Sequence, residues 1–159
     1  MDQNNFRVPG TVLWGTDVQI DRDVFRRGAS TKPNTDFLRY IDLKILDLEG
    51  RIDAEQAKVL VVRPGQGISL FLTRYVGDKF KVLNEEARKT VDKKLQQKVF
   101  WWTVDSGHPI PSGLVLKYDG NPPGHCTLTV ERTMTVEAFL QLMVMVPFSP
   151  QGSDVIGPA

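Results

Sequence analysis

Hydrophobic and polar residues alternate in several short stretches of the chain, a spacing typical of β-strands with one buried face. In the first half it predicts a strand at 11–14 and two more on either side of the Pro-Gly-Gln-Gly break at 64–67. Three further strands are predicted in the second half, at 99–104, 113–118 and 126–131. The segments between them are rich in turn-forming glycine and proline. The pattern therefore predicts a sheet of short strands.

A second pattern, with apolar residues three or four positions apart, predicts helices. It is clearest at 84–99 and 135–146, whose first residues, Asn84 and Thr135, are good N-caps. A third helix is predicted at 35–50, although its apolar residues also fit the alternation of a strand. The eight residues after it add a helical turn or two.

Strands before, between and after the helices indicate an α+β domain with a mostly antiparallel, mixed sheet. The chain of 159 residues has the length of one domain, and we assign residues 1–147 to it. Residues 148–159 lack periodicity, so we expect them to form a mobile C-terminal tail.

The composition is that of an ordinary soluble protein, with 41% hydrophobic and 25% charged residues. A formal net charge of +1 gives no reason to expect direct binding to duplex nucleic acid. No apolar run reaches the roughly 20 residues of a membrane span, and the N-terminus lacks a secretory signal pattern. One cysteine cannot form an intramolecular disulfide. We expect a cytoplasmic protein that, if exported, leaves without a cleaved signal peptide.

His125 and Cys126 are neighbours, which raises the question of whether they act as a chemical pair. A zinc site needs three or four ligands, and His108, His125 and Cys126 supply at most three. Adjacent side chains of a strand point to opposite faces, so His125 is badly placed to activate Cys126. We therefore predict no metal site and a buried Cys126, with His125 facing the other side of the strand.

Three stretches resemble motifs of the ADP-ribosyltransferase-like enzymes. VLWGT at 12–16 is similar to their first strand, which ends in arginine or histidine followed by Gly-Thr. GISLF at 67–71 is similar to their second motif, a strand opened by a small hydroxyl residue, here Ser69. The stretch at 105–139 is the most specific. It resembles the C-terminal half of the small ADP-ribosyltransferase-like toxins delivered by bacterial type VI secretion, which have relatives in fungi.

The third stretch follows that toxin pattern in order. An Ile-Pro strand leads to an aspartate, then come histidine, one residue, threonine and an apolar residue, and finally a Met-led helix with glutamate and phenylalanine. The matching residues are Ile110, Pro111, Leu114, Leu116, Asp119, His125, Cys126, Thr127, Leu128, Met134, Glu137 and Phe139.

The resemblance implies a split, strongly bent β-core with peripheral helices, whose central cleft holds NAD. It implies that Trp14, Gly15 and Thr16 contact the ribose or phosphate of this cofactor. It also implies that Ser69 supports the nicotinamide-side ribose and that His125 lines the cleft, which makes these two the catalytic candidates. The implied function is that of a toxin that transfers ADP-ribose from NAD to an unknown macromolecular target in the cytosol of a target cell. A cognate immunity protein is the partner expected for such a toxin.

Two departures from the family pattern leave another interpretation open. Trp14 replaces the usual arginine or histidine, and no E-x-E or Q-x-E motif is present, which leaves Glu131 and Glu137 as candidate acids. The alternative is a non-catalytic interaction domain with a degenerate cleft. Trp101 and Trp102 could then form an interface, although alternation favours one in the core and one partly exposed. An RNA-directed enzyme of the same superfamily is disfavoured, because it needs more histidines than the two present.

Overall fold

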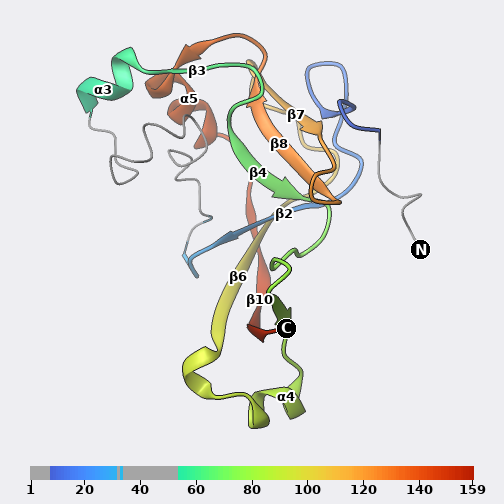
Figure 1. Cartoon of the computed structure of the whole chain (residues 1–159). Coiled ribbons are helices and arrows are strands. Elements are labelled where there is room, and N and C mark those ends of the chain that lie inside the picture. The colour runs from blue at the N-terminus through green and yellow to red at the C-terminus, as the bar shows by residue number, and fades with distance from the viewer. Residues whose placement is uncertain (1–7, 32, 34–53) are drawn as a thin grey trace.

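The strands of the computed structural model form, among the described residues, one eight-stranded sheet and one two-stranded ribbon (Figure 1). The structure describes residues 8–31, 33 and 54–159, so the helix predicted at 35–50 lies outside the described residues. A large sheet with separate helices confirms the predicted α+β class. The strands are β1 Val12–Trp14, β2 Val24–Gly28, β3 Val61–Val62, β4 Ile68–Phe71, β5 Phe80–Val82, β6 Gln97–Val104, β7 Leu114–Tyr118, β8 His125–Val130, β9 Met134–Thr135 and β10 Ser149–Pro158. The helices are α3 Ala54–Val59, α4 Glu85–Thr90, the 3₁₀ turn η2 Lys93–Leu95 and α5 Val136–Met143.

The strand order divides the large sheet into two parts. The order is β1-β7-β8-β4-β2-β6-β10-β5, and the described pairings are antiparallel throughout, where a mostly antiparallel, mixed sheet was predicted. We call β1, β7, β8 and β4, with α3 and α5, the body. We call β6, β10 and β5, with α4, the arm; β2 joins the two, since it pairs with β4 and with β6. In Figure 1, β6 and β10 run from the body toward the end that carries α4.

The core of the body lies between one face of its sheet and α5. Alternation places Leu70, Leu116 and Leu128 on this face, and all three are fully buried. Helix α5 packs on them through its apolar side, and Phe139 is 0% exposed. The helix begins where the sequence predicted, because the hydroxyl oxygen of Thr135 accepts a backbone N–H of the first turn. One face of the body is thereby closed.

The Pro-Gly-Gln-Gly break separates β3 from β4, as predicted, and ties the start of β4 to β8. The N–H of Gly65 donates a 2.8 Å hydrogen bond to Thr129 Oγ1. At Gly67 a Cβ atom would collide with the carbonyl oxygen of Leu128, so this close approach requires glycine. The break therefore sets how β4 and β8 lie against each other.

The helix predicted at 84–99 is shorter than its pattern suggested. Asn84 caps it, as predicted, but α4 ends at Thr90, and the next residue, Val91, is extended. The Gln96 side chain donates to two carbonyls at this end of the helix, which satisfies groups that a longer helix would have paired. No residue of α4 is buried, so no packing favours its extension, and β6 takes up the last residues of the predicted helix.

The C-terminal segment, predicted to be a mobile tail, is a strand, and that prediction is wrong. Strand β10 pairs with β6 along most of its length and with β5 at its end. Two prolines and two glycines within it obscure any alternation. A register shift between Pro150 and Ser153 accommodates the first proline, and Ile156 is fully buried. Long-range pairing, which local pattern does not reveal, determines this strand.

Candidate functional site

A row of polar side chains crosses the face of the body opposite α5. Ser69 on β4 lies opposite Thr127 on β8, and Thr127 lies opposite Lys117 on β7. Paired residues of neighbouring strands point to the same face, so these side chains share a face while their sequence neighbours enter the core. His125, two residues before Thr127, lies on the same face. We call Ser69, Lys117, Asp119, His125 and Thr127 the polar patch.

Hydrogen bonds join four members of the polar patch into one chain. His125 Nε2 lies 2.7 Å from Ser69 Oγ, and His125 Nδ1 lies 2.5 Å from Asp119 Oδ1. The other carboxylate oxygen, Asp119 Oδ2, accepts a 2.7 Å hydrogen bond from Thr127 Oγ1. The His125 side chain is 15% exposed and that of Asp119 is 42% exposed, so a ligand at the surface can reach these hydrogen-bonded side chains. An imidazole between a hydroxyl and a carboxylate can accept and return a proton.

The connection between β7 and β8 places Asp119 beside His125. The backbone N–H groups of Asp119 and Gly120 both donate to the His125 carbonyl, at 3.1 and 3.0 Å. Asp119 Oδ1 also accepts the N–H of Asn121 at 3.3 Å, as aspartate commonly does at turns. Gly120 and Gly124 have φ angles of 71° and 87°, which residues with side chains rarely adopt. The Asp-Gly-Asn-Pro-Pro-Gly sequence thus fixes the carboxylate.

Aromatic rings border the polar patch. Phe71 lies opposite His125 in the register, and the two ring centroids are 5.1 Å apart in a T-shaped contact. Tyr75 stacks on Phe71 with centroids 4.5 Å apart and an interplanar angle of 21°. All three rings are half-buried. An apolar wall beside hydroxyl and imidazole groups suits a ligand that combines a planar ring with a sugar.

Cys126 faces the core, as alternation predicted. It is fully buried and lies opposite Leu70 and Tyr118. Burial, and then the nearby Asp119 carboxylate, raises the pKa of its thiol to about 12, so the reactive thiolate is not formed at neutral pH. Cys126 is therefore a packing residue. Within the ranges the structure describes, no three histidine, cysteine or acidic residues are grouped to hold a metal ion.

The first-strand motif lies apart from Ser69 and His125. Trp14 is opposite Leu116, on the core side of the sheet, and is 0% exposed. Its indole N–H donates a 2.7 Å hydrogen bond to the His108 carbonyl. The motif borders a separate hollow of about 250 Å³. Its lining includes Trp14, Gly15, Thr16, Gly107, His108 and Pro109. The structure thus brings Ser69 and His125 together without Trp14, whose contact with NAD stays a prediction.

The two candidate glutamates have different surroundings. Thr16 Oγ1 donates to Glu131 Oε1 at 3.3 Å, so Glu131 lies beside the first-strand motif. Glu137 is exposed in the first turn of α5, where a carboxylate favours the positive end of the helix dipole. The dipole explains Glu137 without chemistry, and a catalytic part for Glu131 stays a prediction.

Three members of the polar patch received no role from the sequence. Asp119 and Thr127 stand in the motif that carried the resemblance, and alternation along the predicted strands could have placed Thr127 on the face of His125. Lys117 joins them only through the register between β7 and β8. That register, and with it the position of the lysine, required the structure.

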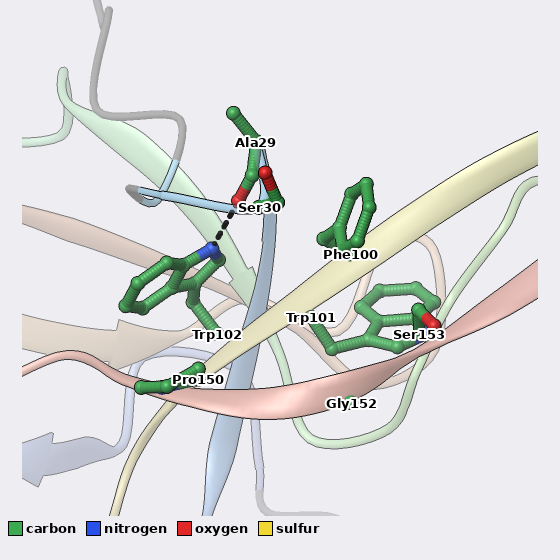
Figure 2. Close-up of a pocket in the computed structure, with 8 residues that line it drawn as sticks. All are labelled: Ala29, Ser30, Phe100, Trp101, Trp102, Pro150, Gly152 and Ser153. Carbon is green, nitrogen blue, oxygen red and sulfur yellow. Dashed lines mark hydrogen bonds between the residues drawn. The ribbon is translucent and has the colours of Figure 1, made fainter.

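Both neighbouring tryptophans of β6 are buried, so the prediction that one is partly exposed is wrong. Trp101 is 2% and Trp102 8% exposed. Trp101 Nε1 donates to Asp154 Oδ2 at 2.7 Å, and Trp102 Nε1 donates to the Ala29 carbonyl at 2.8 Å. Figure 2 shows them on either side of β6, at a hollow of about 210 Å³. The hollow is also lined by Ser30, Phe100, Pro150, Gly152 and Ser153. The main contribution of the two tryptophans is packing.

The large antiparallel sheet with separate helices is consistent with the α+β, ADP-ribosyltransferase-like fold that the resemblance implied. The chain matches the model of the Tse2 ADP-ribosyltransferase toxin family over residues 16–144 and belongs to this family of type VI secretion effectors. The match contains the whole polar patch and begins two residues after Trp14. Comparisons with curated proteins and with solved structures gave no match. In the described part of the chain, no helix is long and apolar enough to cross a membrane.

Proposed function

We propose that this toxin binds NAD at the polar patch and transfers ADP-ribose from it to a macromolecular target inside the cells that it enters. The observation that carries the proposal is the 2.7 Å contact between Ser69 Oγ and His125 Nε2. The two residues come from separate motifs, 56 positions apart, and the resemblance implied a role at the NAD cleft for each. Family membership supports the same reaction.

The side chains of the polar patch fit the chemical groups of NAD. Ser69 and His125 offer hydrogen bonds to ribose hydroxyls. Lys117 is exposed and lies in the same row as Ser69, so its ammonium group offers the cation for the pyrophosphate that Trp14 lacks. The stacked rings of Phe71 and Tyr75 offer an apolar surface for a planar ring. Sugar, phosphate and ring therefore each have a complementary group on this face.

In this proposal the protein orients NAD and accepts one proton from the attacking hydroxyl. When bound, NAD supplies an ADP-ribosyl group whose bond to nicotinamide can break, with positive character developing on the sugar. Ser69 orients the ribose, and His125 Nε2 accepts a proton from an attacking hydroxyl. Asp119 supplies a negative charge close to the imidazole, which favours the positive ring that results. Glu131 remains the candidate for a carboxylate on the first-strand side.

The second candidate function is a non-catalytic interaction domain, and the buried, uncharged Trp14 favours it. Under either function we propose delivery into the target cell and neutralisation by an immunity protein. Such a partner would block the toxin most simply by covering the polar patch. An interaction domain should neither bind NAD nor release nicotinamide from it.

Toxicity on expression inside cells tests the proposed function. Ser69→Ala and His125→Ala should each abolish toxicity while the purified proteins remain folded, whereas Ser106→Ala, in an exposed turn, should leave it unchanged. His108→Ala probes the other hollow. Full toxicity of both Ser69→Ala and His125→Ala would refute the site, and loss of toxicity in His108→Ala alone would move it to the first-strand motif.

A further inference from the structure

The hydrogen-bond chain of the polar patch determines where the imidazole of His125 carries its hydrogen. We infer that Asp119 is a positioning residue, which holds His125 with its hydrogen on Nδ1 and leaves Nε2 as the proton acceptor for Ser69. The catalytic meaning of this inference rests on the proposed function, because the polar patch is the proposed NAD site. The position of the hydrogen itself does not depend on NAD.

An ionised carboxylate only accepts hydrogen bonds, and this decides which atom donates in each hydrogen bond of the polar patch. Oδ1 of Asp119 lies 2.5 Å from His125 Nδ1 and also accepts the N–H of Asn121 at 3.3 Å. Oδ2 accepts the hydroxyl of Thr127 at 2.7 Å. A nitrogen lone pair facing Oδ1 at this distance would be repelled, so Nδ1 donates. In the neutral ring Nε2 then carries the lone pair.

Ser69 is fixed from both sides. Its Oγ lies 2.7 Å from His125 Nε2, and its backbone carbonyl accepts a 2.9 Å hydrogen bond from Nη1 of Arg26, which is buried. With Nε2 as acceptor, the Ser69 hydroxyl donates to it and keeps its own lone pairs for a ligand. A ligand group that meets Ser69 must then donate, as a ribose hydroxyl does and a deprotonated phosphate does not. We therefore expect a sugar hydroxyl of the ligand to bind at Ser69 and its phosphate to bind at Lys117.

The same arrangement defines one proton transfer. When the attacking hydroxyl of the target displaces the Ser69 hydroxyl from Nε2 of His125 and gives its proton to that nitrogen, the O–H bond breaks, its electron pair stays on the oxygen, and the ring becomes an imidazolium. The positive charge then faces the Asp119 carboxylate, which Thr127 holds from its other side. Removing the carboxylate takes away both the orientation of the ring and the charge opposite it.

Nitrogen NMR of the full chain labelled with ¹⁵N-histidine tests the position of the hydrogen. The chain has only two histidines, so His108 is an internal reference and His125→Ala assigns the signals. Along a pH series that ends with both rings neutral, we expect His125 to carry its hydrogen on Nδ1. In Asp119→Ala we expect the neutral ring to shift to the Nε2–H form. Asp92→Ala, which removes a capping carboxylate of η2 in the arm, should leave the His125 signals unchanged.

Either of two results would overturn the inference: a neutral wild-type ring with its hydrogen on Nε2, or the same form in Asp119→Ala as in the wild type. Thr127→Val keeps the carboxylate and should keep the Nδ1–H form. If Asp119→Ala does not fold, the wild-type spectrum still decides where the neutral ring carries its hydrogen, and a hydrogen on Nε2 there overturns the inference.

Release of nicotinamide from NAD separates this inference from the proposed function. We expect Asp119→Ala to lower the rate at least about tenfold, with the amide spectrum preserved away from the polar patch, and Thr127→Val to lower it less. A wild-type protein that neither binds NAD nor releases nicotinamide refutes the proposed function, while the tautomer result stands by itself. A wild-type rate in Asp119→Ala refutes the positioning role and leaves the proposed function intact.

Discussion

The body and the arm share one antiparallel sheet but are stabilised in different ways. In the body, α5 covers one face and buries Phe139 completely, so the other face is free to carry polar groups on a firmly held backbone. In the arm, α4 buries none of its residues, and Leu95 beside it is 56% exposed. The polar patch, whose side-chain hydrogen bonds are 2.5–2.7 Å long, thus lies on the region whose sheet is covered by a helix on its other face.

The buried residues are distributed in the same unequal way. The large core cluster draws mainly on the strands of the body and on α5, with Val24 of β2 and Val104 of β6 at its edge, whereas the smaller buried cluster consists of Val99, Trp101 and Ile156 of the arm. Burial of apolar surface is the main favourable term in folding. We therefore expect the free energy of unfolding to come mostly from the body and the arm to open locally before it.

Truncating one apolar side chain in each region, buried in the body and exposed in the arm, gives the largest expected contrast. Phe139→Ala should lower the free energy of unfolding by about 3–5 kcal/mol, because it leaves a cavity under the sheet. Leu95→Ala, in the arm, should change it by less than about 0.5 kcal/mol, because that side chain is mostly exposed. Urea denaturation measures both. Similar costs for the two variants would refute the division into a stabilising body and a peripheral arm.

The buried thiol behind the polar patch should make the body sensitive to alkali. The folded pKa of Cys126 is about 12, above the ordinary value of 9.0, so between these values the unfolded chain releases a proton that the folded chain keeps. Stability is therefore fully present below about pH 9 and falls above it. At about pH 10.5 the wild type should lose about 2 kcal/mol relative to its value at about pH 8.

Cys126→Ala isolates this effect, because lysine and tyrosine residues titrate in both proteins. The variant should start less stable, since it loses buried volume, but should lack the additional alkaline loss. Parallel pH dependences of the two proteins, measured by urea denaturation, would show that the thiol is not buried as described.

The two helix caps give a smaller contrast. Thr135→Ala removes the cap of α5 and should lower the free energy of global unfolding by about 1 kcal/mol. Asn84→Ala removes the cap of α4 and should mainly speed hydrogen exchange in α4, because that helix contributes no buried residue. Equal losses of global stability in the two variants would contradict the comparison.

Sequence patterns predicted the elements of the body better than those of the arm, for a physical reason. The apolar residues of strands β7 and β8 and of helix α5 follow the period of a strand or a helix with a buried face, so the local pattern predicts these elements. Strand β10 carries proline and glycine and owes its conformation to pairing with β6. Helix α4 has a good cap but no buried face to extend it. Where long-range contacts decide the structure, local pattern was insufficient.

The candidate site likewise contains some residues that the sequence placed correctly and others that only the structure placed. Alternation correctly placed His125 and Cys126 on opposite faces, and the resemblance pointed to Ser69 and His125 before their contact was known. The part of Asp119 depended on a turn that folds its carboxylate back onto the imidazole. The place of Lys117 depended on strand register. Neither turn geometry nor register follows from residue spacing alone.

Calorimetric titration of NAD into the full chain tests most directly the claim that the polar patch is the NAD site. The wild type should bind. His125→Ala should bind at least about tenfold more weakly, which corresponds to about 1.4 kcal/mol. Lys117→Ala should bind NAD more weakly than the wild type, and the difference should shrink as salt is added, because salt screens the charge of the lysine. Asp92→Ala should match the wild type. No binding by the wild type, or undiminished binding by both His125→Ala and Lys117→Ala, would contradict the account.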